Sequence, residues 1–127
     1  MRYLLDTHTL IWLVEGSSKV SPKIKEALRF SGNTVFLSAV SLWEIAIKSS
    51  LGRLELKKPF KKLLDDLNST NIEILQLKNE YLLNVTALPL IHKDPFDRLI
   101  ISTALAEGLT IITTDGSIQK YDVSQIW

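Results

Sequence analysis

Short apolar segments alternate with longer helical ones along nearly the whole chain, and this alternation restricts the fold more than any other feature of the sequence. Apolar, β-branched and aromatic residues predict strands at 3–5, 34–38, 71–77 and 110–114, with a last extended piece at 123–127. Helices between them carry the chain back across the sheet, so that neighbouring strands pair in parallel. We therefore predict an α/β fold with a central, mostly parallel, four- to five-stranded sheet flanked by helices.

Capping residues mark the boundaries of two of the predicted helices. Ser21 before Pro22 predicts a helix start, with Gly32 as the stop. Asp94 followed by proline predicts a second start, for a helix that ends at Gly108. Further helices are predicted at 10–14, 39–50, 60–68 and 80–87, and a short helical turn at 117–120.

The composition narrows the class of protein. With 127 residues and 46% hydrophobic content, the chain is expected to form a single domain, residues 1–127, around one core. A net charge of +1 gives no strong attraction to polyanions or membranes, and the absence of cysteine excludes disulfides and thiolate metal sites. Asp6 and His8 interrupt the apolar stretch near the N-terminus, which is neither a signal peptide nor a membrane span. We expect a cytoplasmic protein.

Four carboxylates stand where this pattern places backbone at one edge of the sheet. Asp6 and Asp115 each end a predicted apolar strand, and Glu44 and Asp97 fall early in predicted helices. Ligands of open α/β sheets bind beyond the carboxyl ends of the strands, so we expect the four acids to lie there together. An acid at the end of a buried strand is costly unless a charged or hydrogen-bonding group meets it.

A shared cation would account for such a cluster. Two carboxylates about 4 Å apart repel by roughly 4 kcal/mol at an effective dielectric constant near 20, so four together need protonation or a divalent ion. Oxygen ligands without cysteine or a clear histidine pair favour Mg²⁺ or Mn²⁺. One or two such ions can activate water for attack on a phosphodiester.

Three of the acids also have local explanations. Ser41 and Glu44 have the spacing of a capping box, in which the glutamate reaches back to the cap amide. Asp94 matches an N-cap, with Asp97 favoured by the helix dipole, and Asp115 begins an ordinary turn dipeptide. The acid that ends the first strand is the hardest to explain locally. Since each of the others has a local explanation, the inference of a shared site depends on all four acids meeting at one edge of the sheet.

Other polar residues near this edge are candidates for supporting roles. Arg98 is a candidate contact to a substrate phosphate, because it adjoins Asp97. His8 and His92 are candidate ligands or proton carriers, although a loop histidine such as His92 more often faces solvent. Asp94 fits an N-cap better than a ligand. Three hydroxyl groups are expected to hydrogen-bond to the carboxylates: Thr7, Ser41 and Thr113.

The motifs that carry these acids resemble the PIN-domain family, and within it the VapC-type toxins of bacterial toxin–antitoxin pairs. The matching segments appear in family order and span essentially the whole chain. They are Leu-Leu-Asp-Thr-His at 4–8, Leu-Ser-Ala-Val-Ser-Leu-Trp-Glu-Ile at 37–45, His-Lys-Asp-Pro-Phe-Asp-Arg-Leu-Ile at 92–100 and Ile-Thr-Thr-Asp at 112–115.

The resemblance implies a PIN-like fold and an endoribonuclease that requires Mg²⁺ or Mn²⁺ and cuts single-stranded regions of RNA. Asp6, Glu44 and Asp97 match the family's three central acids, and Asp115 matches its more variable fourth. The implied partners are a cognate VapB-type antitoxin, which often places an arginine in the acidic pocket, and a second copy of the chain. Three aromatic residues would serve these contacts if exposed, although core packing is their default: Trp12, Trp43 and Trp127.

The leading hypothesis is therefore a toxin that hydrolyses RNA with water activated by the metal, leaving a 5′-phosphate and a 3′-hydroxyl. Asp6 and Asp97 would bind the principal metal ion, with Glu44 and Asp115 completing its ligands directly or through water. The alternative is a non-catalytic α/β module, either receiver-like or an inactive PIN domain that acts through protein partners. A receiver needs paired acids after its first strand, and here Asp6 stands alone before Thr7.

Overall fold

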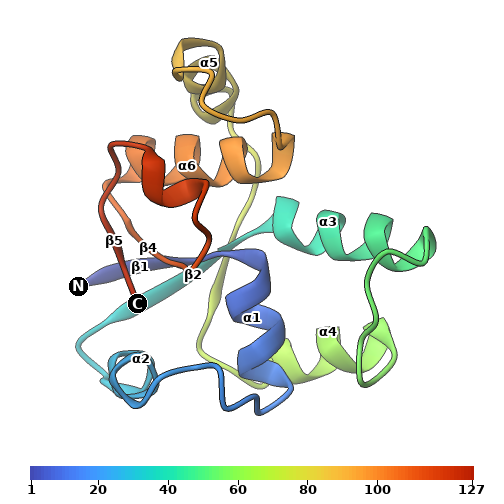
Figure 1. Cartoon of the computed structure of the whole chain (residues 1–127). Coiled ribbons are helices and arrows are strands. Elements are labelled where there is room, and N and C mark those ends of the chain that lie inside the picture. The colour runs from blue at the N-terminus through green and yellow to red at the C-terminus, as the bar shows by residue number, and fades with distance from the viewer.

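The five strands form one fully parallel sheet. The computed structural model describes residues 1–127 and orders the strands β3-β2-β1-β4-β5 (Figure 1). All four strand pairs are parallel, which confirms the predicted α/β class. The strands are β1 (Arg2–Leu5), β2 (Thr34–Ser38), β3 (Glu73–Leu75), β4 (Thr110–Ile112) and β5 (Gln125–Ile126).

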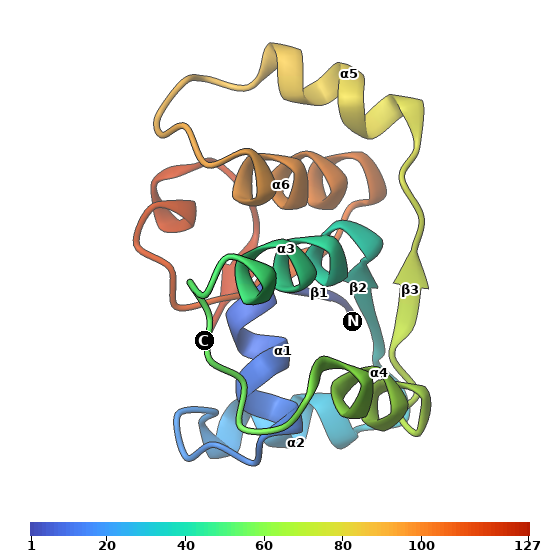
Figure 2. The same ribbon diagram turned by 90° about the vertical axis from the view of Figure 1, so that its right-hand side faces the viewer.

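Helices cover both faces of the sheet. Figures 1 and 2 show α5 and α6 on one side, α1, α2 and α4 on the other, and α3 extending from the end of β2. The helices are α1 (Thr7–Val14), α2 (Pro22–Arg29), α3 (Ala39–Ser50), α4 (Phe60–Asn68), α5 (Asn79–Ala87) and α6 (Pro95–Glu107), with a 3₁₀ turn η1 (Ile118–Lys120). None of the helices has the length and apolar character needed to cross a membrane.

Alternate residues of the central strand separate the core into two clusters. Leu5 packs with Leu10 of α1 and Ile45 of α3 on one face, whereas Leu4 packs with Ile100 and Ile101 of α6 on the other. All six side chains are fully buried. A strand covered on both faces must be apolar at successive positions, which is why β1 reads as a continuous apolar run.

The predicted N-caps of α2 and α6 are confirmed, whereas α2 ends at Arg29, before the predicted stop at Gly32. Ser21 accepts a hydrogen bond from the amide of Ile24, and Asp94 accepts one from the amide of Asp97. Gly108 ends α6 with φ 66°, a left-handed conformation that glycine adopts without the steric cost of a side chain. The third and fourth strands are shorter than predicted, since β3 covers only Glu73–Leu75 and β4 ends at Ile112.

The strand order creates a reversal point beside β1. From β1 the chain moves outward to β2 and β3, then returns to the other side of β1 to form β4 and β5. A crevice forms beyond the carboxyl ends of parallel strands at such a reversal. Asp6 follows β1 directly, so the fold places this acid at that point.

Candidate functional site

Asp6 is held at the start of α1 by two hydrogen bonds. Its Oδ1 accepts from the amide of Thr9 at 2.7 Å, and its Oδ2 accepts from the hydroxyl of Thr113. The residue is 5% exposed, yet its charge is compensated by the first turn of a helix, where a negative group is favoured. The expected hydroxyl contact from Thr113 is therefore present, and it joins the ends of β1 and β4.

Glu44 is almost completely buried and is held by a hydroxyl and an ammonium group. The Thr7 hydroxyl donates to Oε1 at 2.6 Å and Lys48 Nζ donates to Oε2 at 2.5 Å. The capping-box explanation is wrong, because Ser38 rather than Ser41 is the N-cap of α3 and accepts from the Val40 amide. Since Glu44 does not cap the helix, the hydrogen bonds from Thr7 and Lys48 are the contacts that stabilise its buried carboxylate.

The three predicted supporting hydroxyls differ in what they touch. Thr7 contacts Glu44, and Thr113 contacts Asp6, as expected. The Ser41 hydroxyl lies 3.0 Å from the Thr7 hydroxyl, whose proton is donated to Glu44, and it hydrogen-bonds to no carboxylate itself. Its expected role is corrected: Ser41 acts on Thr7, whose hydroxyl lies between the serine and the glutamate.

Asp97 lies in the first turn of α6 and has an unfavourable environment for a charge. Burial raises its pKa to about 6, the hydrogen bond with His92 opposes the rise, and the charges of three other acids add to it. Those acids are Asp94, Asp115 and Glu44. The structure thus places Asp97 close enough to Glu44 and Asp115 for mutual repulsion, as expected of acids gathered at one edge of the sheet.

Asp115 lies beyond the end of β4 and caps the turn η1. Its Oδ1 accepts from the amides of Ser117 at 2.8 Å and Ile118 at 3.0 Å. Its own amide donates to the Thr113 hydroxyl at 2.9 Å. Since Thr113 also donates to Asp6, one threonine fixes the backbone of one acid and a carboxylate oxygen of another. The predicted turn role is confirmed for this residue.

Lys48 is the cation that the structure places among the acids. Burial lowers its pKa, but the hydrogen bond to Glu44 and the charges of three neighbouring carboxylates outweigh burial, so the net pKa lies above its usual value. The Glu44–Lys48 pair has the i, i+4 spacing that brings side chains together on a helix. This spacing was a readable signal in the sequence, and the pairing was not predicted.

His92 and Arg98 occupy places that differ from those predicted. His92 is partly buried and its Nε2 lies 3.1 Å from Oδ2 of Asp97, so it does not simply face solvent. Arg98 is 9% exposed, and its guanidinium donates to the backbone carbonyls of Pro89, Val85 and Leu88. These internal contacts favour a structural role for Arg98 over the expected RNA contact, because its donors are used inside the protein.

Tyr121 is a residue of this region that sequence reasoning missed. Its hydroxyl lies 2.8 Å from Nδ1 of His92 and accepts a hydrogen bond from Arg98 at 3.0 Å. No local sequence pattern predicts these contacts, because the tyrosine follows η1 and is far in sequence from both partners. His8, the other histidine, is exposed and packs near Trp12 with ring centroids 6.3 Å apart, so the structure does not support its candidate role as a ligand.

The donor chemistry of the site fits an oxygen-coordinated divalent ion, and the repulsion acting on Asp97 is what such an ion would relieve. In this structure, no group of three histidine, aspartate or glutamate side chains is close enough together to hold a metal ion. Asp6 and Glu44 instead use both carboxylate oxygens to accept hydrogen bonds from protein groups. A cation would therefore have to replace some of these donors.

The charge on Asp97 should cost stability in the metal-free protein. Because the folded-state pKa is raised, the stability present below about pH 4 is lost as the pH rises through about 6. We expect Asp97→Asn to raise the free energy of unfolding by about 1–2 kcal/mol at pH 7.5, after allowance for solvent screening of a partly exposed group. Asparagine keeps an oxygen that can accept from His92.

Urea denaturation in EDTA at pH 7.5 and pH 4 would measure this difference. The gain should nearly vanish at pH 4, where the wild-type carboxyl is protonated as well. Asp65→Asn is a matched control, because Asp65 lies in an exposed surface pair with Lys61 on α4. A variant that is less stable than wild type at pH 7.5 would contradict the assignment of repulsion at Asp97.

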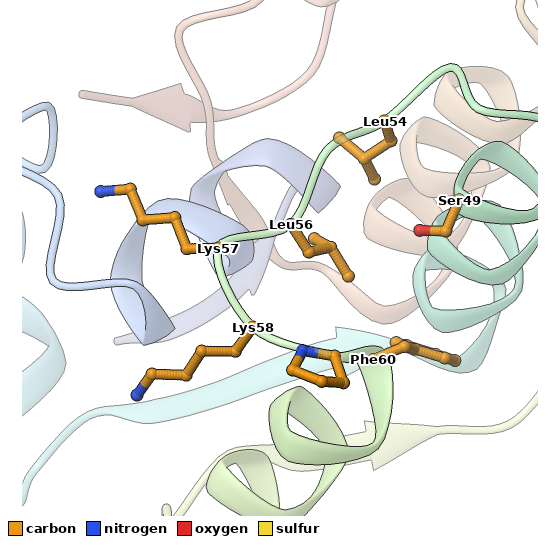
Figure 3. Close-up of a pocket in the computed structure, with 7 residues that line it drawn as sticks. Ser49, Leu54, Leu56, Lys57, Lys58 and Phe60 are labelled. Atoms are coloured by element: carbon orange, nitrogen blue, oxygen red, sulfur yellow. The ribbon is translucent and has the colours of Figure 1, made fainter.

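A separate hollow lies at the connection between α3 and α4. It has a volume of about 410 Å³ and is lined by Ser49, Leu54, Leu56, Lys57, Lys58, Pro59 and Phe60. Figure 3 shows the leucines, Ser49 and Phe60 around the hollow, with the two lysine side chains extending away from it. It contains no acid or histidine, so it is not the carboxylate site.

The three tryptophans have different environments. Trp12 and Trp127 pack edge to face with ring centroids 5.8 Å apart. Both lie against the core, which is the default position expected for such residues. Trp43 is 61% exposed and packs edge to face on Phe96, 5.6 Å away. Among these residues only Trp43 presents a large aromatic surface to solvent, and it stands beside Glu44 in sequence.

Comparisons with known proteins agree with the motifs. The PIN domain family model matches residues 3–124. Ribonuclease VapC22 of Mycobacterium tuberculosis is 25% identical over 119 residues, which are 93% of this chain and 90% of the relative. The resemblance to VapC-type proteins that the motifs predicted is therefore confirmed.

Solved structures show the same fold. VapBC2 from Rickettsia felis, bound to a DNA fragment from its promoter, superimposes with a TM-score of 0.76 at 20% identity, covering 99% of this chain and 98% of the other. VapBC-1 from nontypeable Haemophilus influenzae gives 0.68 at 17% identity, covering 99% and 97%. These similarities confirm the predicted PIN-like architecture.

Proposed function

This chain belongs to the PIN domain family, and on that premise we propose that it is a divalent-metal-dependent endoribonuclease that serves as the toxin of a toxin–antitoxin pair. The observation that carries the proposal is the position of Asp6, Glu44 and Asp97 at the carboxyl edge of the sheet. The raised pKa of Asp97 supports it, because burial and, to a smaller extent, the charges of neighbouring acids disfavour the ionised form, which a bound cation would stabilise. The name of the curated relative, a ribonuclease, supports the substrate class.

Asp6, Glu44, Asp97 and Asp115 are the residues that would hold Mg²⁺ or Mn²⁺. The bound ion would supply an activated water and would neutralise charge on the phosphodiester. Thr113 and Thr7 orient Asp6 and Glu44 through the hydrogen bonds described above. Hydrolysis by this route leaves a 5′-phosphate and a 3′-hydroxyl on the RNA.

Lys48 has two tasks in this proposal. In the metal-free protein it pairs with Glu44 and limits the repulsion among buried acids. Its side chain is 31% exposed, so it can turn toward a phosphate when a cation takes over the charge of Glu44. Single-stranded RNA is the proposed substrate, because unpaired nucleotides are open to protein contacts that a duplex does not offer.

The test is cleavage of a labelled single-stranded RNA by the purified chain, with Mn²⁺, with Mg²⁺ and with excess EDTA. We expect cleavage with either ion, loss of cleavage in EDTA, and recovery when the ion is restored. The new ends should carry 5′-phosphates, detected by ligation without prior kinase treatment. Cleavage that persists in EDTA would contradict the proposal, and absence of Mn²⁺ binding by calorimetry would favour an inactive PIN domain.

We further propose a VapB-type antitoxin and a second copy of the chain as partners. The solved relatives named above are VapBC proteins, which supports the first. Exposed apolar side chains on and after α5 support a protein contact: Leu82, Leu83, Leu90 and Ile91. Co-expression with the product of the neighbouring open reading frame should yield a stable complex in which RNA cleavage is suppressed.

A further inference from the structure

A chain of hydrogen bonds connects the buried Arg98 to the carboxylate of Asp97. Arg98 Nη1 lies 3.0 Å from the Tyr121 hydroxyl, which lies 2.8 Å from Nδ1 of His92. His92 Nε2 in turn lies 3.1 Å from Oδ2 of Asp97. Figure 1 shows how this becomes possible: the red segment that contains η1 folds back against α6. Groups from two distant parts of the chain therefore meet next to the acidic site.

The direction of each hydrogen bond follows from the donors available. Arg98 and the backbone amide of His92 can only donate, and both point at the Tyr121 oxygen, at 3.0 and 3.4 Å. The tyrosine oxygen thus accepts twice, and its single proton is left for Nδ1 of His92. A neutral imidazole that accepts at Nδ1 carries its proton on Nε2. That proton is then directed at Asp97.

We propose that His92 is a positioning residue for Asp97, held as the Nε2–H tautomer by Tyr121 and Arg98. Its donation to Oδ2 fixes the carboxylate and leaves Oδ1 available to a cation. Its part in metal binding rests on the function proposed above, whereas the tautomer itself does not. Neither Tyr121 nor His92 needs to touch the substrate in this role.

The arrangement is rigid at both ends. Arg98 is anchored by the carbonyl of Pro89 at 2.9 Å and by two further carbonyls of the connection between α5 and α6. The Asp97 amide is anchored by Asp94 Oδ1 at 2.9 Å, which fixes the first turn of α6. A histidine between two fixed groups can select one orientation of a carboxylate, which is the function of groups that support metal ligands.

The first test reads the tautomer directly by ¹⁵N–¹H NMR of the histidine rings at a pH where both are neutral. The chain has 2 histidines, so His8, which is exposed, serves as an internal reference. We expect His92 in wild type to show the Nε2–H pattern, and Tyr121→Phe to lose this preference. A wild-type His92 protonated on Nδ1, or averaged like His8, would overturn the proposal.

The second test is Mn²⁺ affinity by calorimetry, in which no RNA is present. His92→Ala should weaken binding by about 10–100-fold, and His92→Gln, whose amide can donate to Asp97, should restore it to within about threefold of wild type. His8→Ala is the matched control and should bind as wild type does. Equal affinity for folded His92→Ala and wild type would overturn the proposal. If wild type binds no Mn²⁺, the proposed function fails, and the NMR result still decides the tautomer and the positioning of Asp97.

Discussion

Replacing Asp6 with asparagine should slow RNA cleavage by about 100-fold or more while leaving the fold intact. Asparagine is as good an N-cap as aspartate, so its oxygen can still accept from the Thr9 amide at the start of α1. The change removes the negative charge that would hold the cation, together with the oxygen that accepts the hydrogen bond from the Thr113 hydroxyl. The loss should therefore appear in cleavage and in Mn²⁺ binding rather than in stability.

Single-turnover cleavage at saturating enzyme would measure this effect without interference from product release. Asp65→Asn makes the same chemical change at an exposed position on α4 and should cleave as fast as wild type. Urea denaturation should place Asp6→Asn within about 1 kcal/mol of wild type. Cleavage by Asp6→Asn at the wild-type rate would remove this acid from the site and would weaken the whole functional proposal.

Arg98→Leu should lower the free energy of unfolding by about 3 kcal/mol, the largest effect on stability that we expect. The guanidinium satisfies the carbonyls of Pro89 and Val85 and the hydroxyl of Tyr121 in a region that is mostly shielded from water. Leucine fills part of the space but donates nothing, so these acceptors lose their partner. The connection between α5 and α6 would lose its main polar anchor.

Denaturation midpoints for Arg98→Leu and Arg53→Leu would separate a structural role from an RNA contact. Arg53 is exposed, and its variant should remain within about 0.5 kcal/mol of wild type. RNA affinity should be measured at a temperature where both variants are folded. An Arg98→Leu protein that is as stable as the control but binds RNA poorly would restore Arg98 as a phosphate contact.

The elements with strong local signals were predictable from the sequence. The start of α2 at Pro22 and the start of α6 at Pro95 were both correct, because a capping side chain followed by proline satisfies and fixes the first turn locally. β1 and β2 were correct as well, since they lie in the middle of the sheet and are apolar on both faces. Shorter β3 and β4 depend on pairing with neighbours, which is a tertiary property.

The start of α3 shows where local reasoning fails. Ser38 and Ser41 both stand near this helix start, and the spacing of Ser41 to Glu44 favoured the wrong one. The pairing of β2 with β1 determines which serine is the N-cap. Because β2 continues to Ser38, that serine stands directly before the helix and caps it. Glu44 is thereby freed to meet Thr7, a residue that follows the neighbouring strand.

The order of strands and helices was predictable from local patterns, as was the position of Asp6, Glu44 and Asp97 near the carboxyl edge. Capping, hydrophobic periodicity and parallel topology act over short distances or follow general rules. Three further properties arise from the folded arrangement: the partner of each carboxylate oxygen, the burial of Arg98 and the raised pKa of Asp97. Those properties depend on desolvation and on contacts between residues far apart in the chain, such as His92 and Tyr121. No local pattern encodes them.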